Sequence, residues 1–197
     1  MNDTKDFILD AAFTLFLNNN YESVTFTELC RATKLTKGAV YHYFSSKEEL
    51  FKAVIDKYVL SAHNSNQTDS LALDQLIKTK ISEIERRMQN SIVSQLDKYN
   101  SAPLNYIQLL FLSYKYYPDF KKIGDTIMVG EIEVWKKSIR NSIEKKLIRN
   151  DIDVDTTAFT FISIITNLIL RLIHTKSESH LEIIKKQLNG MYGLLKV

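Results

Sequence analysis

Glycine and proline are scarce in this chain, since its 197 residues include only five glycines and two prolines. β-Sandwiches and barrels need many tight turns, and doubly wound α/β folds need glycine at theirs, so a mostly helical fold is favoured. Apolar residues make up 45% of the chain and charged residues 25%. That balance is ordinary for globular proteins and leaves enough apolar material for one or two small domains.

The residues that carry chemistry in enzymes and metal sites are few here. One cysteine, Cys30, excludes an internal disulfide and a cysteine-cluster metal site, and it suits a buried core position better than a redox role. The four histidines show no paired metal-ligand spacing, and no glycine-rich phosphate loop or nucleophile motif occurs. We therefore expect no metal, no cofactor and no enzymatic activity.

Targeting and membrane signals are weak. Met1–Asp6 is polar and acidic, so a signal peptide is not expected. The most apolar stretch, 159–173, contains several polar residues and is shorter than the roughly 20 residues that a spanning helix needs. We interpret it as a helix buried in a core or subunit interface, with a membrane span as the alternative, and expect a cytoplasmic protein without a membrane partner.

The first predicted helix runs from Asp3 or Thr4 to about Asn18, because its apolar residues share one face at helical spacing. Three asparagines end it, and Asn20 is expected in the left-handed conformation that terminates many helices.

Capping residues mark the next three helices. Thr25 and Glu28 form a capping box for the second helix, and Thr36 caps a short third helix over 37–44. The run Ser46–Glu49 is a second capping box and opens the fourth helix. A turn of about three residues between the second and third helices is typical of a helix-turn-helix.

Beyond residue 60 the chain divides into a polar linker and a series of helices. Ser61–Ser70 is polar and without periodicity, which favours a linker. Asp155 is expected to cap an apolar helix over 156–174, and the last helix has the seam spacing of a coiled coil. The other amphipathic stripes predict helices over 73–96, 104–117 and 128–147, the last broken at Asn150 and Asp151.

The third helix has the properties of a DNA-contacting surface. Val40 and Phe44 lie one turn apart and can hold it against the first two helices. Outward-facing phenol and imidazole groups suit hydrogen bonds to phosphates and base edges. The alternative is a helix packed against a second domain, with ordinary solvated lysines. The residues left to point outward are Lys37, Gly38, Tyr41, His42 and Tyr43.

Residues 7–51 resemble the N-terminal domain of the TetR family of bacterial transcriptional regulators. The resemblance lies in the threonine-capped second helix, in the run Leu35–Phe44 and in Ser46–Phe51. Lys34 departs from the family pattern because it stands where glycine is frequent, so we expect a slightly reshaped turn there. Cys30 departs from it too, where alanine is usual. The resemblance implies that the DNA-contacting residues are Thr25, Thr27, Lys37, Gly38, Ala39, Tyr41, His42, Tyr43 and Lys47.

The rest of the chain is predicted to form a ligand pocket and a dimer interface. Aromatic stripes are often core, but a buried tyrosine needs a partner for its hydroxyl, and the resemblance implies a pocket in the second domain. Candidate pocket residues are Tyr99, Tyr106, Phe111, Tyr114, Tyr117, Met128 and Trp135. The last two helices are either monomer core or, as the resemblance implies, half of a four-helix bundle between two copies. Candidate interface residues are Phe161, Ile165, Leu168, Leu172, Leu181, Ile184, Leu188, Met191 and Leu195.

Charge is a local rather than a global signal. The whole chain carries a formal charge of +3, but the first 63 residues hold seven basic and eight acidic residues. Between Thr25 and Lys47, four basic residues face a single acidic one, Glu28. This cluster predicts a modest dependence of DNA affinity on salt.

These features predict an all-α homodimer of two domains that binds double-stranded DNA. Residues 1–46 would form a three-helix helix-turn-helix domain, a helix over 47–60 would connect, and 47–197 would form a helical ligand-binding and dimerisation domain. We expect a repressor that a small-molecule inducer, partly apolar or aromatic, releases from a palindromic operator. The alternatives are a regulator without a small-molecule ligand and a small-molecule-binding protein that does not bind DNA.

Overall fold

The computed structural model describes residues 2–61, 71–89, 102–174 and 179–197. Their regular elements are all helical, apart from a single bridge between Ile148 and Lys196, which confirms the predicted all-α class. The chain forms two compact units, one of residues 1–65 and 104–124 and the other of residues 66–103 and 125–197. No helix in the described ranges is long and apolar enough to cross a membrane.

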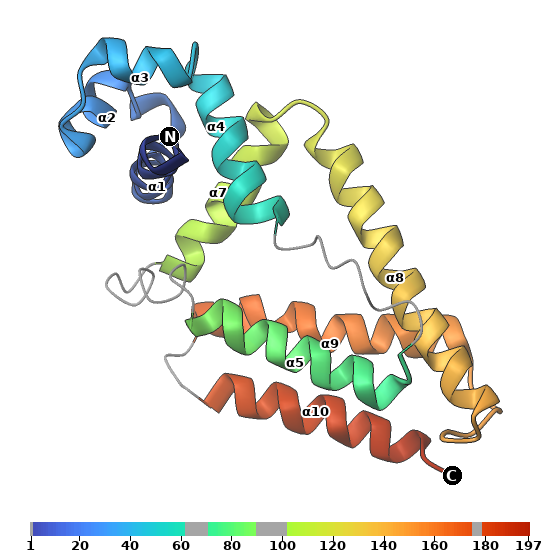
Figure 1. Cartoon of the computed structure of the whole chain (residues 1–197). Coiled ribbons are helices and arrows are strands. Elements are labelled where there is room, and N and C mark those ends of the chain that lie inside the picture. The colour runs from blue at the N-terminus through green and yellow to red at the C-terminus, as the bar shows by residue number, and fades with distance from the viewer. Residues whose placement is uncertain (1, 62–70, 90–101, 175–178) are drawn as a thin grey trace. The chain divides into compact units, whose positions relative to one another are not determined.

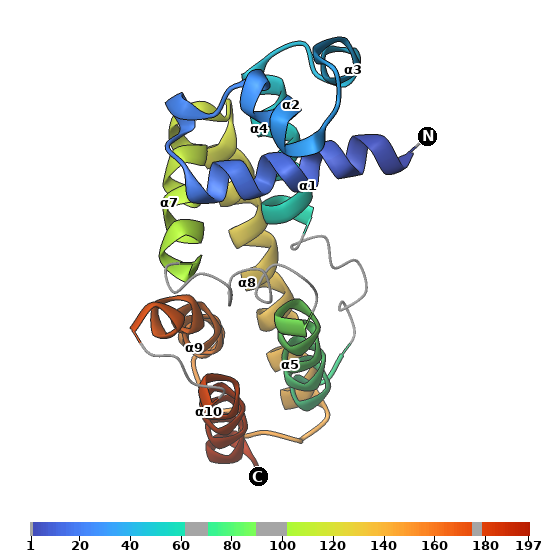
Figure 2. The ribbon, with the colours of Figure 1, turned by 90° about the vertical axis from the view of Figure 1, so that its left-hand side faces the viewer.

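The first unit joins the N-terminal helices to one helix from the middle of the chain (Figures 1 and 2). Its elements are α1 (Asn2–Asn18), the short turn η1 (Tyr21–Ser23), α2 (Phe26–Thr33), α3 (Lys37–Tyr43), α4 (Lys47–Ile55), the π-helical turn η2 (Asp56–Leu60) and α7 (Ala102–Tyr116). The second unit contains α5 (Leu73–Gln89), most of α8 (Phe120–Glu144), α9 (Val154–His174) and α10 (Ser179–Leu195).

Side-chain caps begin the helices of the first unit largely as predicted. The hydroxyl of Thr25 accepts a hydrogen bond from the amide of Glu28 at 3.2 Å, and the Glu28 carboxylate accepts from the Thr25 amide at 3.1 Å. Thr36 accepts from the amide of Ala39 at 3.2 Å. These bonds satisfy amides that the first turn of a helix leaves without partners, and so define where α2 and α3 begin.

One further predicted cap is correct in part, and one predicted helix end is wrong. Ser46 caps α4 as predicted, since its hydroxyl accepts from the amide of Glu49 at 3.1 Å, but the Glu49 side chain accepts from the amide of Ser45 at 2.8 Å rather than from that of Ser46. Asn20 is extended, with φ −63° and ψ 143°, rather than left-handed. The amide side chains of Asn18 and Asn19 donate instead to the carbonyls four residues back, each at 2.9 Å, and satisfy the end of α1 without a left-handed residue.

An aromatic cluster forms the centre of the first unit. The ring edges of Phe16 and Tyr21 meet Phe51 with centroid distances of 5.0 and 5.1 Å, and all three side chains are buried. Val24 and Leu29 bracket the start of α2 at the positions of a hydrophobic staple, and both are buried. α1 runs beneath α2 and α4 and is seen end on in Figure 1 and along its length in Figure 2.

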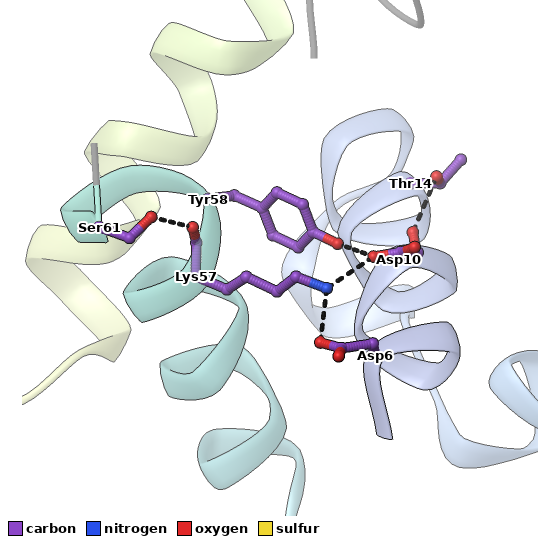
Figure 3. Close-up of polar contacts among 6 residues, drawn as sticks. All are labelled: Asp6, Asp10, Thr14, Lys57, Tyr58 and Ser61. Atoms are coloured by element: carbon purple, nitrogen blue, oxygen red, sulfur yellow. Dashed lines mark hydrogen bonds and ion pairs between the residues drawn. The ribbon is translucent and has the colours of Figure 1, made fainter. Parts of the chain in front are cut away.

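A polar clamp joins α1 to η2 (Figure 3). The amine of Lys57 donates to Asp6 and Asp10 at 2.8 and 2.9 Å, and the hydroxyl of Tyr58 donates to the same Asp10 oxygen. The ring of Tyr58 stacks on Phe13 with centroids 4.2 Å apart. Burial opposes the charge on Lys57, but the bonds to both carboxylates raise its pKa above the ordinary value. The clamp therefore fixes where η2 sits along α1.

The second unit is a helical bundle with a continuous apolar core. α5, α9 and α10 lie roughly side by side, seen along their lengths in Figure 1 and nearly end on in Figure 2. Trp135 of α8 is fully buried and stacks on Phe161 of α9 with centroids 5.1 Å apart. The core stripe of α5 supplies Leu73, Leu76 and Ile77.

Two predicted boundaries of the second unit are wrong. α8 ends at Glu144, before Asn150, because Lys146 turns left-handed at φ 56° and its amide bonds back to the carbonyl of Ile143 at 2.9 Å. α9 is capped by Asp153, whose carboxylate accepts from the amide of Thr156 at 2.7 Å. Asp155 forms an ion pair with a lysine of α8 instead.

One charged residue lies in the core stripe of α5. Lys80 is 7% exposed, and its amine is 2.9 Å from a Glu131 oxygen on α8. The Trp135 indole donates to Glu131 at 3.0 Å. A buried pair of this kind costs desolvation energy, and removing one partner leaves the other charge without compensation.

We therefore predict that Lys80→Met lowers the free energy of unfolding by about 2–3 kcal/mol, measured by urea denaturation. Adding Glu131→Gln should recover most of the loss, because the carboxylate nearest to the lost amine is then neutral and Trp135 can still donate to the amide oxygen. Glu83, whose carboxylate is 3.7 Å from the Lys80 amine, keeps its charge in both variants. Lys78→Met is the matched control on the same helix, since its exposed pair with Asp74 contributes little. A double variant as unstable as Lys80→Met would contradict the prediction.

The aromatic cluster also predicts an alkaline loss of stability. Burial, followed by the nearby Glu48 carboxylate, raises the pKa of Tyr21 from 10.0 to about 12. Because the folded state then holds the phenol proton more tightly than the unfolded state, the contribution is complete below pH 10 and is lost between pH 10 and 12.

We expect this contribution to be on the order of 1–2 kcal/mol, seen by comparing urea unfolding at about pH 9 and about pH 11. Tyr21→Phe keeps the packing but has no proton to lose, so its stability should fall less over that interval. Parallel curves for the two proteins would show that Tyr21 does not titrate as stated.

Candidate nucleic-acid interface

One side of α3 is buried in the first unit, and the other side is exposed to solvent. Val40 and Phe44 are 0% and 1% exposed, so the predicted anchors are confirmed as buried. Tyr41 is 46% exposed, and the edge of its ring packs against Phe26 of α2 with centroids 4.6 Å apart. His42 is exposed and Tyr43 is half-buried, so the hydroxyl and imidazole groups of α3 are available to an external partner.

The start of α3 is open to close approach. Lys37 and Gly38 are exposed, and the Lys37 amine lies over the Tyr41 ring at 5.6 Å from its centroid. A Cβ built on Gly38 would meet nothing within 4 Å. Packing within the chain therefore gives no reason for glycine here, whereas a molecule approaching the end of the helix closely would. Ala39 is half-buried beside it.

The start of α2 presents two threonines, both exposed. The hydroxyl of Thr25 accepts the capping bond from the amide of Glu28, and Thr27 lies two residues further on, in the first turn of α2. The structure thus brings the nine predicted DNA-contacting residues into one folded unit, on α2, α3 and the first turn of α4.

Lys47 has a structural role that the sequence did not indicate. Its amine donates to the carbonyls of Tyr21 and Glu22 at 2.8 and 3.3 Å and lies over the Tyr21 ring at 4.4 Å from the centroid. It therefore closes the turn η1 against α4. An ammonium group has three donors, so at most one remains for a phosphate.

The turn between α2 and α3 contains a left-handed lysine. Lys34 has φ 58° and ψ 19°, so the expectation of a reshaped turn is wrong. The buried hydroxyl of Thr33 donates to the carbonyl of Leu29 at 2.7 Å and accepts from the amide of Leu35 at 3.4 Å, which bridges the turn on both sides of Lys34. A left-handed L-residue costs roughly 1–2 kcal/mol, a cost that glycine avoids.

The cations of the N-terminal helices differ in whether a carboxylate pairs with them. Lys52 pairs with Asp56 at 3.2 Å, and Lys57 lies in the clamp with two carboxylates. By contrast, Arg31 and Lys34 are exposed, and within the described residues their side chains form no ion pair, hydrogen bond or ring contact. Positive charge without a paired carboxylate therefore lies around the α2–α3 turn, although residues 1–63 hold seven basic and eight acidic residues in all. The sequence placed both in the basic cluster between Thr25 and Lys47, but only Lys37 and Lys47 of that cluster were predicted to contact DNA.

The candidate pocket residues are divided between the units. Tyr117 is buried in the first unit, where its hydroxyl donates to Asp56 of η2 at 2.6 Å. Phe111 and Tyr114 belong to the same unit and are exposed, and Tyr106 is half-buried. Met128 and Trp135 belong to the second unit, where Met128 is 47% exposed and Trp135 lies in the core. Tyr99 lies outside the described residues.

Four candidate interface residues are already covered within one chain. Phe161, Ile184 and Leu188 are 0% exposed and Leu195 is 5% exposed, because the seam of α10 faces α5 and α9. A second copy cannot reach these side chains. Ile165, Leu181 and Met191 are half-buried against the same core, and the side chains of Leu168 and Leu172 lie outside the described part. Among the described side chains of these two helices, the large exposed apolar residues are Phe159 and Leu194, at 51% and 75%.

Comparison with known proteins agrees with this geometry. Residues 8–54 match the family model of bacterial regulatory proteins, tetR family. The chain is 42% identical over 50 residues to the A-factor receptor protein of Streptomyces griseus, a match that covers 25% of this chain and 18% of that protein. It is 23% identical over 197 residues to the HTH-type transcriptional regulator SrpR of Pseudomonas putida, covering 98% and 86% of the two chains.

The fold is shared over nearly the whole chain. A TetR-family transcriptional regulator from Cytophaga hutchinsonii superposes with a TM-score of 0.66 at 21% identity, covering 99% of this chain and 96% of that one. Residues 8–54 therefore form a helix-turn-helix domain of the tetR family of bacterial regulatory proteins, and the chain as a whole shares the fold of the regulator on which it superposes.

Proposed function

We propose that this protein is a homodimeric transcriptional repressor that binds DNA, and that a small-molecule effector causes it to dissociate from DNA. The observation that carries the proposal is α3: its inner side chains are buried in the unit, and its outer side chains offer hydroxyl, imidazole and ammonium groups without full partners. A helix that only faces solvent does not need these groups on its surface, whereas DNA phosphates and base edges would supply hydrogen-bond partners for them.

In this proposal α3 enters the major groove. The open start of the helix around Gly38 allows the backbone to approach the duplex closely, and its amides favour a phosphate. Tyr41, His42 and Tyr43 contact base edges or the backbone, and Thr25 and Thr27 contact the strand at the start of α2. Two copies related by a two-fold axis then require a palindromic site with half-sites about one helical turn apart.

Dimerisation is proposed to use the outer faces of α9 and α10. The apolar residues on their inner faces are buried in the chain's own core. The contact between two copies must therefore use side chains that are exposed in the single chain, among them Phe159 and Leu194. Large apolar side chains that are exposed on neighbouring elements are typical of an interface.

The effector is proposed to be partly apolar or aromatic, in keeping with the aromatic side chains of α7. An effector changes operator affinity only through a difference in its affinity for the two conformations, and couplings of about 1–3 kcal/mol are usual. Screening metabolites for a ligand that both raises the melting temperature and weakens operator binding tests this part.

The DNA-binding role is tested by replacing Tyr41 and Tyr43 together with alanine. Specific binding to operator fragments selected from the source genome should fall at least about 100-fold, since two groups that read or position the DNA are lost. Tyr114→Ala is the matched control, because it removes an exposed tyrosine of the same unit from a different helix. Circular dichroism should show all three proteins folded, and unchanged affinity in the double variant would refute the assignment of α3.

The dimer is tested by Phe159→Glu combined with Leu194→Glu. We expect monomers by light scattering with the helical content retained, because both side chains are exposed in the single chain. Leu188→Glu should instead unfold the second unit, since it buries a charge in the core. A folded dimer in the double variant would show that another surface forms the interface.

A further inference from the structure

The turn between α2 and α3 carries positive charge that the fold does not use. Arg31 lies in the last turn of α2, Lys34 ends that helix, and Lys37 begins α3. Packing and ion pairing within the described residues account for neither Arg31 nor Lys34, whose side chains are exposed and have no partner there. Lys34 also occupies a backbone conformation in which glycine would be easier.

Backbone strain alone does not identify a site. Lys146, after α8, is also left-handed at φ 56° and exposed, and it belongs to an ordinary helix end. Lys34 differs in its setting: it lies between the two helices of the helix-turn-helix, within three residues of both Arg31 and Lys37. The nearest acidic residue of α2, Glu28, is occupied by its capping bonds to Thr25.

We propose that Lys34 binds a DNA phosphate, so that the turn between α2 and α3 contacts the backbone of the duplex in addition to α3. This rests on the proposed DNA-binding function and names a contact that the family-type motif residues do not include. A lysine amine is a compact charge on a flexible stem, which suits a phosphate rather than the fixed geometry of a base edge. A bond between Lys34 and a phosphate therefore raises the affinity for every DNA sequence to the same extent.

The left-handed backbone explains why the contact falls at this residue. The bonds of Thr33 to Leu29 and Leu35 hold the turn in one conformation whichever residue occupies position 34. A side chain at that position is exposed beside the start of α3, so a lysine there adds a charge to the DNA-facing edge without any change in the fold.

The test measures the affinity of the full chain for a short mixed-sequence DNA duplex and for a selected operator fragment, by fluorescence anisotropy over a series of salt concentrations. Lys34→Gln should weaken binding to both duplexes about 10-fold and reduce the slope of log affinity against log salt by about 1 for each protomer bound. Lys34→Arg should retain the affinity and the slope. Lys34→Gly should lose both as Lys34→Gln does, while its melting temperature rises by about 2–4 °C.

Lys146→Gln and Lys146→Gly are the matched controls, because they remove the same charge and the same backbone strain at a helix end outside the first unit. They should leave affinity and salt slope unchanged. If the unmodified chain binds the operator and Lys34→Gln binds both duplexes with an unchanged slope, the inference is overturned while the DNA-binding function stands. If the unmodified chain retains no genomic fragment at all, the proposed function fails, and the inference fails with it.

Discussion

The aromatic cluster of Phe16, Tyr21 and Phe51 is the packing on which the DNA-facing surface depends. It joins α1, η1 and α4, and the amine of Lys47 bonds to the carbonyl of Tyr21 in this cluster. α3 contacts α2, which in turn packs against α1. A short helix such as α3 has too few residues to be stable alone, so its position relative to α2 is set by what lies beneath it. The clamp of Asp6, Asp10 and Lys57 extends this support along α1.

Residues 1–63 carry no net positive charge, but the distribution of their ion pairs leaves a basic surface around the α2–α3 turn. Carboxylates pair with Lys52 and Lys57, whereas the exposed side chains of Arg31 and Lys34 form no ion pair within the described residues. A balance counted over the sequence therefore says little about what a duplex would meet. Few free charges also mean that hydroxyl groups, amides and helix ends must supply much of the affinity, so a modest overall salt dependence fits the structure.

Much of the first unit could be predicted because its signals are local. Capping residues bond to amides three positions away, so Thr25 and Thr36 mark the starts of α2 and α3 wherever those helices pack. The burial of Val40 and Phe44 follows from helical periodicity in the same way. The errors concern single capping bonds: Asp153 rather than Asp155 caps α9, and the Glu49 carboxylate accepts from the amide of Ser45 rather than from that of Ser46.

The partner of each side chain could not be predicted, because it depends on contacts between residues that lie far apart in the sequence. Periodicity shows that the seam of α10 is apolar but not what covers it, and in the folded chain it faces α5 and α9. Lys47 carries the same charge whether it meets a phosphate or the carbonyls of η1, and only folding brings those carbonyls within reach. Local bonding thus determines where the helices begin and which faces are apolar, whereas long-range packing determines which charges and apolar faces remain open to another molecule.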